Sequence, residues 1–311
     1  MLRKQIQLGL VHVAVAMTLV PINSTLNRVM IKELEISATL VAILASLPYL
    51  FSPLQVAIGS YSDRHPILGF RRTPYIALGL LLCVIGVIVS PQVAFLMAAS
   101  PALGILAAAL AFGAWGMGYN LSAVSYLSLA TEISGEKSRG RTIAIMWFMM
   151  IVSIILTSIS ISRMVEPYSP QALEQAFIVV ALAALGLGIL GLIKVEERSA
   201  QRQTSSTDQH SLGEMVRVIR KSPQVTTFFF YLLLLLAAIL GQDILLEPFA
   251  AEAFGMTVQQ TTRITSIWGV SVLLAILAAG ALERRAPRKA VAQTGNLGAL
   301  TGFLFIIAGG F

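Results

Sequence analysis

Charged residues are scarce in this chain. Only 12% of its 311 residues are Asp, Glu, Lys or Arg, whereas 56% are hydrophobic, and the mean hydropathy is +0.81. An ordinary soluble domain carries about 25% charged residues. The scarcity of charge excludes that class of protein, and the apolar content indicates an all-α polytopic membrane protein.

Cysteine and histidine are scarce as well. The single cysteine, Cys83, lies inside an apolar run, which excludes a disulfide framework. The three histidines stand far apart, at positions 12, 65 and 210, and no metal-ligand spacing, nucleophile–base pattern or phosphate-binding loop is recognisable. We therefore expect no enzymatic activity.

Apolar runs of about twenty residues recur along the chain, and each is long enough to cross about 30 Å of hydrocarbon. Nine segments are expected as transmembrane helices: 6–30, 38–61, 74–97, 102–130, 142–163, 173–193, 225–247, 264–282 and 290–311. With the N-terminus on the cytoplasmic side, all but four of the 22 Lys and Arg residues fall on inner connections. This bias predicts a multi-pass protein whose basic side contacts anionic lipid headgroups rather than nucleic acid.

A polar stretch divides the chain. We expect a six-helix N-terminal bundle over 1–194, a cytoplasmic linker with a short amphipathic helix over 195–224, and a partial C-terminal bundle of three helices over 225–311. A six-plus-six transporter architecture needs three further helices, so the second bundle is expected to be truncated.

The connection between the second and third expected helices carries a recognisable pattern, formed by Gly59, Asp63, Arg64, Gly69, Arg71 and Arg72. It resembles the signature of the major facilitator superfamily, in which a Gly is followed by Asp-Arg and then by a Gly and paired basic residues. The physical expectation is that Gly59 permits close helix approach and that Asp63 pairs with a basic group. A charged turn that merely obeys the positive-inside rule is the alternative. The resemblance implies the facilitator fold.

Candidate binding residues are the polar side chains that fall in or at the ends of apolar segments: His12, Asn23, Asn27, Arg28, Asn120, Gln242, Asp243 and Glu247. Asp243 and Glu247 are four residues apart and share one helix face. At about 1.5 Å per residue, Asp243 lies roughly 27 Å along its helix. We therefore expect both carboxylates at the outer edge of the hydrocarbon, which argues against a proton relay. Helix-packing hydrogen bonds are the alternative role for the amides and Arg28.

Two stretches are more specific. Residues 24–34, Ser-Thr-Leu-Asn-Arg-Val-Met-Ile-Lys-Glu-Leu, resemble the end of the first helix in the PucC/LhaA family of photosynthetic bacteria and cyanobacteria. Residues 242–262 resemble the seventh-helix region of the same family, and residues 71–75 fit as well. Residues 119–132 depart from the His/Gln/Thr-rich fourth helix of many purple-bacterial members, which indicates a cyanobacterial branch.

The resemblance implies a membrane assembly factor for chlorophyll-binding antenna or photosystem subunits, in a thylakoid, cytoplasmic or intracytoplasmic membrane. Pigment-synthesis enzymes are further implied partners, and chlorophyll, or a carotenoid, is the implied ligand. His12 is the membrane-segment histidine that could ligate a chlorophyll magnesium, with helix packing as its alternative role. Two other functions remain open: a secondary transporter of a small solute by alternating access, and a scaffold with neither pigment nor flux.

Overall fold

The computed structural model describes residues 2–198, 223–282 and 285–309, apart from the side chains at positions 56, 60, 137, 240, 243, 280 and 288. The expected amphipathic helix of the linker lies outside these residues. The elements are α1 (Leu2–Met17), the π-helical segments η1 (Pro21–Leu26) and η2 (Val29–Glu33), α2 (Ala38–Ala45), α3 (Leu47–Leu50), α4 (Leu54–Arg64), α5 (Thr73–Ala99), α6 (Pro101–Met164), α7 (Pro170–Leu192), α9 (Pro223–Phe254), α10 (Val258–Leu282) and α11 (Arg288–Gly309).

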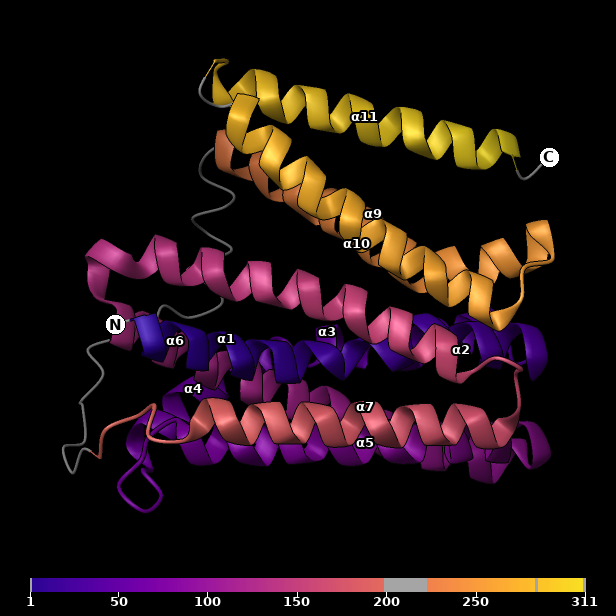
Figure 1. The fold of residues 1–311 in the computed structure, drawn as a ribbon, viewed down its shortest axis with the longest axis horizontal. Helices are drawn as coiled ribbons and strands as arrows, with labels where there is room; N and C mark the ends of the chain where they lie inside the picture. The colour runs from indigo at the N-terminus through magenta and orange to yellow at the C-terminus, as the bar shows by residue number, and fades with distance from the viewer. Residues whose placement is uncertain (1, 199–222, 283–284, 310–311) are drawn as a thin grey trace.

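The described residues contain seven helices that are long and apolar enough to cross a membrane, or eight if the bent α9 counts as one span. The prediction of an all-α polytopic membrane protein is thereby confirmed. The prediction of one continuous helix over 38–61 was wrong, because the three short helices α2, α3 and α4 take its place. Pro48 and Pro53 lack the backbone N–H that a continuous helix needs, so this apolar run is interrupted. The three short helices still follow one another along the length of the molecule (Figure 1).

The first span also departs from a regular α-helix. Pro21 stands at the start of η1, and wide π turns continue through η2 to Glu33. A proline inside a helix removes one backbone hydrogen bond, and the chain adapts by widening its turns. Such π segments are common at functional sites. Here Ser24, Thr25 and Arg28 contact residues of the C-terminal part of the chain.

The long helix α6 contains two spans, Pro101–Glu136 and Ser138–Met164. Gly135 separates them with a φ of +59°, a conformation that glycine adopts without the strain of a Cβ. The N-terminus, the 65–72 loop and this reversal lie at the same end of the molecule, at the left of Figure 1. The basic connections therefore gather at one end, as their alternation along the sequence predicts.

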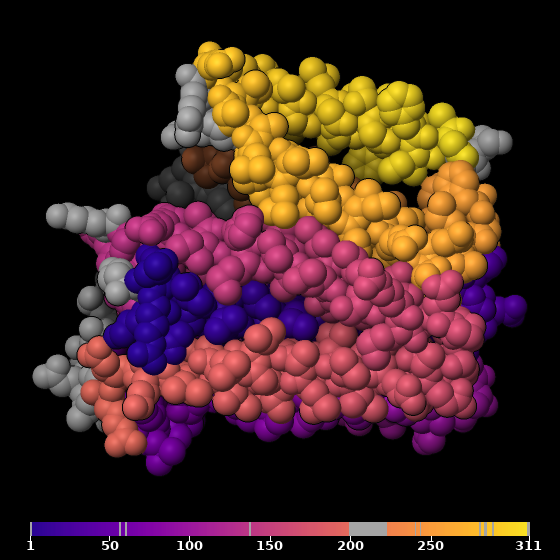
Figure 2. Space-filling model, viewed as in Figure 1, coloured from indigo at the N-terminus to yellow at the C-terminus, as the bar shows by residue number. Residues whose placement is uncertain are grey.

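The core sits among α1, α5, α6 and α7, where Phe112, Trp115 and Phe177 are almost completely buried. Figure 1 shows α9 and α10 inclined to these helices and closest to them at the end opposite the N-terminus. The first half of α9 carries exposed apolar side chains such as Phe228 and Leu234, as a lipid-facing helix does. In the space-filling view, α11 stands farthest from the N-terminal helices (Figure 2).

Candidate functional site

Five polar residues from η1, α9 and α10 meet between the N-terminal helices and the C-terminal helices. We call them the interhelical polar cluster: Ser24, Thr25, Glu247, Thr262 and Thr265. Ser24 donates a hydrogen bond to Oε1 of Glu247, and Oγ1 of Thr265 donates to the same oxygen over 2.5 Å. The Oγ1 atoms of Thr25 and Thr262 lie 3.1 Å apart. The cluster therefore joins segments that are more than 200 positions apart in sequence.

Helix α6 strengthens the same junction. Ser158 donates a hydrogen bond to the backbone oxygen of Thr262, and Ser162 donates to that of Gln259 over 3.0 Å. Without water in the bilayer core, serine and threonine hydroxyls find partners on neighbouring helices. These bonds fasten α10 to the N-terminal helices at the end opposite the N-terminus.

Glu247 is the acidic member of the cluster, and its side chain is buried with 2% relative exposure. The residue is thus covered by neighbouring helices, and its expected depth at the outer edge of the hydrocarbon stays a prediction. Helix α9 bends by 45° between Ile239 and Ile244, so counting residues along one straight helix does not give the depth of Glu247. A carboxylate removed from water needs partners or chemistry to compensate its lost hydration.

A cavity of about 130 Å³ adjoins the cluster. It is lined by Ala16, Leu19, Val20, Asn23, Ser24, Tyr49, Ile154, Leu246, Glu247, Thr265 and Trp268. Pockets that enclose drug-sized ligands measure about 300–1,000 Å³. The cavity is therefore too small to enclose a chlorophyll macrocycle.

His12, the candidate magnesium ligand, is buried on α1 away from this cavity's lining. Its ring centroid lies 5.2 Å from that of Tyr126 and 5.7 Å from that of Trp147, both on α6. An axial ligand must offer a ring nitrogen to a metal at the centre of a wide, flat macrocycle. The two aromatic side chains occupy the space beside the imidazole, so the surroundings of His12 do not fit an enclosed chlorophyll.

Arg28 is buried and joins two parts of the chain. It donates hydrogen bonds to the carboxylate of Glu33 and, over 3.0 Å, to the backbone oxygen of Met256 between α9 and α10. Asn27 instead turns back on its own helix, where Nδ2 donates to the backbone oxygen of Asn23 over 3.1 Å. Arg28 therefore anchors the α9–α10 connection, whereas Asn27 makes a local contact.

Asn120 has a packing role in the structure. Its Nδ2 donates to the backbone oxygens of Pro48 (2.7 Å) and Gly116 (2.8 Å), and its Oδ1 accepts from Gln55 (2.5 Å). It thereby satisfies a carbonyl at the break in the second span. Gln242 is half-buried on α9 outside the lining of the cavity, and the side chain of Asp243 lies outside the described residues.

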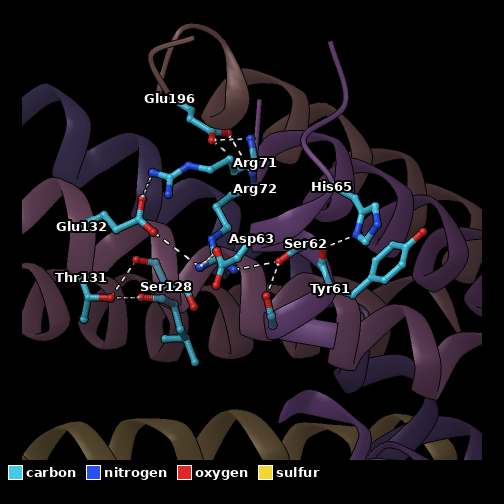
Figure 3. Close-up of polar contacts among 12 residues, drawn as sticks. Tyr61, Ser62, Asp63, His65, Arg71, Arg72, Ser128, Thr131, Glu132 and Glu196 are labelled. Atoms are coloured by element: carbon cyan, nitrogen blue, oxygen red, sulfur yellow. Dashed lines mark hydrogen bonds and ion pairs between the residues drawn. The ribbon is translucent and has the colours of Figure 1, made fainter. Parts of the chain in front are cut away.

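The facilitator-type loop forms part of a second site at the opposite end of the molecule, which we call the inner charged network: Asp63, Arg71, Arg72, Glu132 and Glu196. Nη2 of Arg72 lies 2.5 Å from Asp63 and 3.5 Å from Glu132, and Nη2 of Arg71 lies 3.1 Å from Glu132 (Figure 3). Nη1 of Arg72 donates to Ser62 over 2.8 Å. The network connects α4, α5 and the middle of α6.

Glu196, beyond the end of α7, accepts hydrogen bonds from the backbone N–H groups of Arg71, Arg72 and Thr73, where the chain enters α5. Its carboxylate lies 2.8 Å from the nitrogen of Arg71 and 2.7 Å from that of Thr73 (Figure 3). A carboxylate at this place satisfies donors that have no partner within the helix and complements the helix dipole. The neighbouring Glu197 is exposed, and its hydrogen bond with Lys4 lowers the pKa of its carboxyl group.

The remaining residues of the loop shape the backbone. Gly69 has a φ of +81°, which favours glycine, and a Cβ on Gly59 would meet Val124 of α6 at 3.3 Å. Arg64 is exposed. The loop therefore contributes Asp63 and the paired arginines to the network, and its glycines permit the turn and the close packing.

Sequence reasoning missed several members of both sites: Ser24, Thr25, Glu132, Glu196, Thr262 and Thr265. Thr262 and Thr265 are three residues apart and share a helix face where the apolar segment 264–282 begins, which is a signal that could have identified them. Glu196 is more than 120 positions from the helix start that it caps, and no local pattern indicates that contact.

Comparison with known proteins gives the family. The family model described as PUCC protein matches residues 25–311. Protein PucC of Cereibacter sphaeroides is 31% identical over 315 residues, which cover 98% of this chain and 69% of the relative. Protein PucC of Rhodobacter capsulatus is 28% identical, with 98% and 68% covered. The bacteriochlorophyll synthase 44.5 kDa chain of the same species is 29% identical, with 88% and 63% covered.

Proposed function

The chain belongs to the PucC family, and on this basis we propose that it acts in the assembly of photosynthetic pigment–protein complexes. The single observation that carries this proposal is the family match over residues 25–311. The name of one relative, which refers to bacteriochlorophyll synthase, supports a connection with pigment supply. The multi-pass architecture supports a membrane-embedded role.

The clients in this proposal are chlorophyll-binding antenna or photosystem subunits of a thylakoid or intracytoplasmic membrane, and the chain acts on them without catalysing a reaction. Contact with chlorophyll or a carotenoid would take place at the lipid-facing surface, because the cavity beside Glu247 is small and the rings of Tyr126 and Trp147 lie beside His12. Trp147 and Phe148, which are 51% and 60% exposed, offer apolar area for such contact.

The test is removal of the gene from the organism that carries it, followed by re-expression of the chain. We expect pigment–protein complexes to decline in membrane absorption spectra while the messenger RNA of their subunits is unchanged, and we expect re-expression to restore them. Unchanged complex levels in the deletion strain would contradict the proposal.

A secondary transporter of a small solute is the second candidate. The buried carboxylate of Glu247 beside a cavity between two groups of helices favours it. Reconstituted vesicles distinguish the two functions, since a transporter gives protein-dependent solute uptake and an assembly factor gives none.

A further inference from the structure

The two carboxylate oxygens of Glu247 have different surroundings. Oε1 accepts hydrogen bonds from Ser24 and Thr265, whereas Oε2 is buried and has no hydrogen-bond partner among the described residues. No Lys, Arg or His nitrogen of the described chain lies within 4.0 Å of this carboxylate. The nearby Arg28 is engaged with Glu33 and the backbone oxygen of Met256. One oxygen of a buried acid is therefore left for a group that the chain itself does not supply.

Asn23, which also lines the cavity beside Glu247, carries a second unpartnered oxygen. Oδ1 of Asn23 is buried and also has no partner in the described part of the chain. Both residues line the cavity of about 130 Å³. An amide oxygen accepts hydrogen bonds, and so does a carboxylate oxygen. The two unpartnered oxygens therefore fit a ligand that donates hydrogen bonds, and a positive charge on that ligand would stabilise a carboxylate that burial alone disfavours.

The other residues that line the cavity limit the chemical class of the ligand. Magnesium and calcium need about six or more oxygen ligands, and the cavity offers far fewer unpartnered oxygens. Its other walls are mainly apolar, and the side chains of Tyr49 and Trp268 add aromatic surface, which favours organic cations. A volume of about 130 Å³ limits the occupant to a few non-hydrogen atoms.

From this geometry we propose that the cavity between η1, α9 and α10 binds the protonated amino group of a small organic amine, with Glu247 as the counter-charge and Asn23 as the second acceptor. Ser24 and Thr265 hold the carboxylate through Oε1, which leaves Oε2 without a partner in the described part of the chain. The proposal does not depend on the role in complex assembly, because it concerns an equilibrium of the purified chain.

The test is titration of the full chain, purified in a nonionic detergent, with n-butylammonium chloride. Tryptophan fluorescence, to which Trp268 in the cavity lining contributes, and isothermal calorimetry report binding. Two probes serve as controls: n-butanol has the same shape without the charge, and sodium chloride supplies an inorganic cation. We expect saturable binding of n-butylammonium, at least tenfold weaker binding of n-butanol, and no displacement by sodium at equal concentration.

Glu247→Gln removes the charge and keeps an oxygen that can accept from Ser24 and Thr265. We expect it to weaken n-butylammonium binding at least tenfold. The matched control is Glu252→Gln on the same helix, where the carboxylate is exposed and lies 3.0 Å from Lys32; this variant should bind like the unaltered chain.

Several outcomes would overturn the proposal. Absence of saturable n-butylammonium binding would do so, as would equal affinity for n-butanol, which indicates an apolar pocket only. Displacement by sodium would indicate an inorganic cation site instead. The comparison of the two organic probes uses the unaltered chain, so it decides the question even if Glu247→Gln does not fold.

Discussion

Gly79 of α5 and Gly118 of α6 face each other so closely that a Cβ added to either would lie 2.5 Å from the carbonyl oxygen of the other. The contact is reciprocal and involves backbone atoms, so no side-chain rotation can relieve it. In a bilayer, where helix association draws on close packing rather than on the exclusion of water, such small residues allow two backbones to approach. This pair therefore sets the distance between the two helices at the centre of the N-terminal half.

We predict that Gly79→Ala lowers the free energy of unfolding by about 1–3 kcal/mol, the usual cost of forcing an extra carbon into a packed interior. Thermal unfolding in detergent, followed by circular dichroism, measures the change. Gly113→Ala on α6 is the matched control, because a Cβ there would meet nothing within 4 Å. The control should be neutral or up to about 1 kcal/mol more stable, because alanine favours helix more than glycine does. Equal unfolding of both variants would contradict the close approach.

A second prediction concerns the inner charged network. Asp63→Asn removes the carboxylate 2.5 Å from the buried guanidinium of Arg72 and leaves Glu132 at 3.5 Å as its remaining acidic partner. We expect a loss of about 1–3 kcal/mol, below the full cost of breaking a buried ion pair, because one partner is retained. The exposed neighbour Arg64 gives the control: Arg64→Gln should unfold like the unaltered chain. Identical thermal unfolding of the two variants would show that the Asp63–Arg72 pair contributes nothing.

Much of the helical architecture could be predicted from the sequence, because length and hydropathy decide whether a segment can cross a bilayer. The helix expected over 74–97 is α5, Thr73–Ala99, in the structure, and the helix expected over 173–193 is α7, Pro170–Leu192. Each begins with a proline in its first turn, a position that tolerates the missing N–H. The division of the expected helix 38–61 into α2, α3 and α4 was missed because hydropathy does not register how Pro48 and Pro53 interrupt the backbone hydrogen bonds.

The sites were predictable only in part. The facilitator-type loop is a local pattern, and the structure pairs Asp63 with Arg72 within it. The burial of Glu247 depends on the bend of α9 and on hydroxyls from η1 and α10, which are tertiary features without a local signal. The same holds for the cap that Glu196 places on α5. The wider facilitator arrangement, the cyanobacterial origin and the cytoplasmic side of the N-terminus stay predictions.

A third prediction concerns Glu196, whose carboxylate caps the start of α5. Glu196→Ala deprives the backbone N–H groups of Arg71 and Thr73 of their acceptor. We expect a loss of about 1–2 kcal/mol, as for the removal of a helix cap, and faster hydrogen exchange of the amides at the start of α5. Glu197→Ala removes the adjacent carboxylate, which is fully exposed and bonds to Lys4, and should leave both measurements unchanged. Equal exchange at the start of α5 in the two variants would count against a capping role.

The last prediction concerns Arg28, which holds the connection between α9 and α10. Arg28→Gln removes the donors to Glu33 and to the backbone oxygen of Met256. Glu33 is 37% exposed in its side chain and can be hydrated after the change, whereas the Met256 carbonyl loses a charged donor. We therefore expect a loss of about 1–3 kcal/mol, the range for hydrogen bonds to charged groups. Hydrogen exchange should rise in residues 255–258 and stay unchanged at the core of α5.

The matched control for Arg28→Gln is Arg263→Gln, which removes an exposed arginine from α10 and should leave exchange at residues 255–258 unaltered. In the photosynthetic host, we expect Arg28→Gln to insert into the membrane in normal amounts and to reduce pigment–protein complexes, because the junction between the two groups of helices is loosened. Normal levels of pigment–protein complexes together with faster hydrogen exchange at residues 255–258 would show that Arg28 contributes to stability and has no part in complex assembly. Unchanged exchange would show that the bond to Met256 does not hold the connection at all.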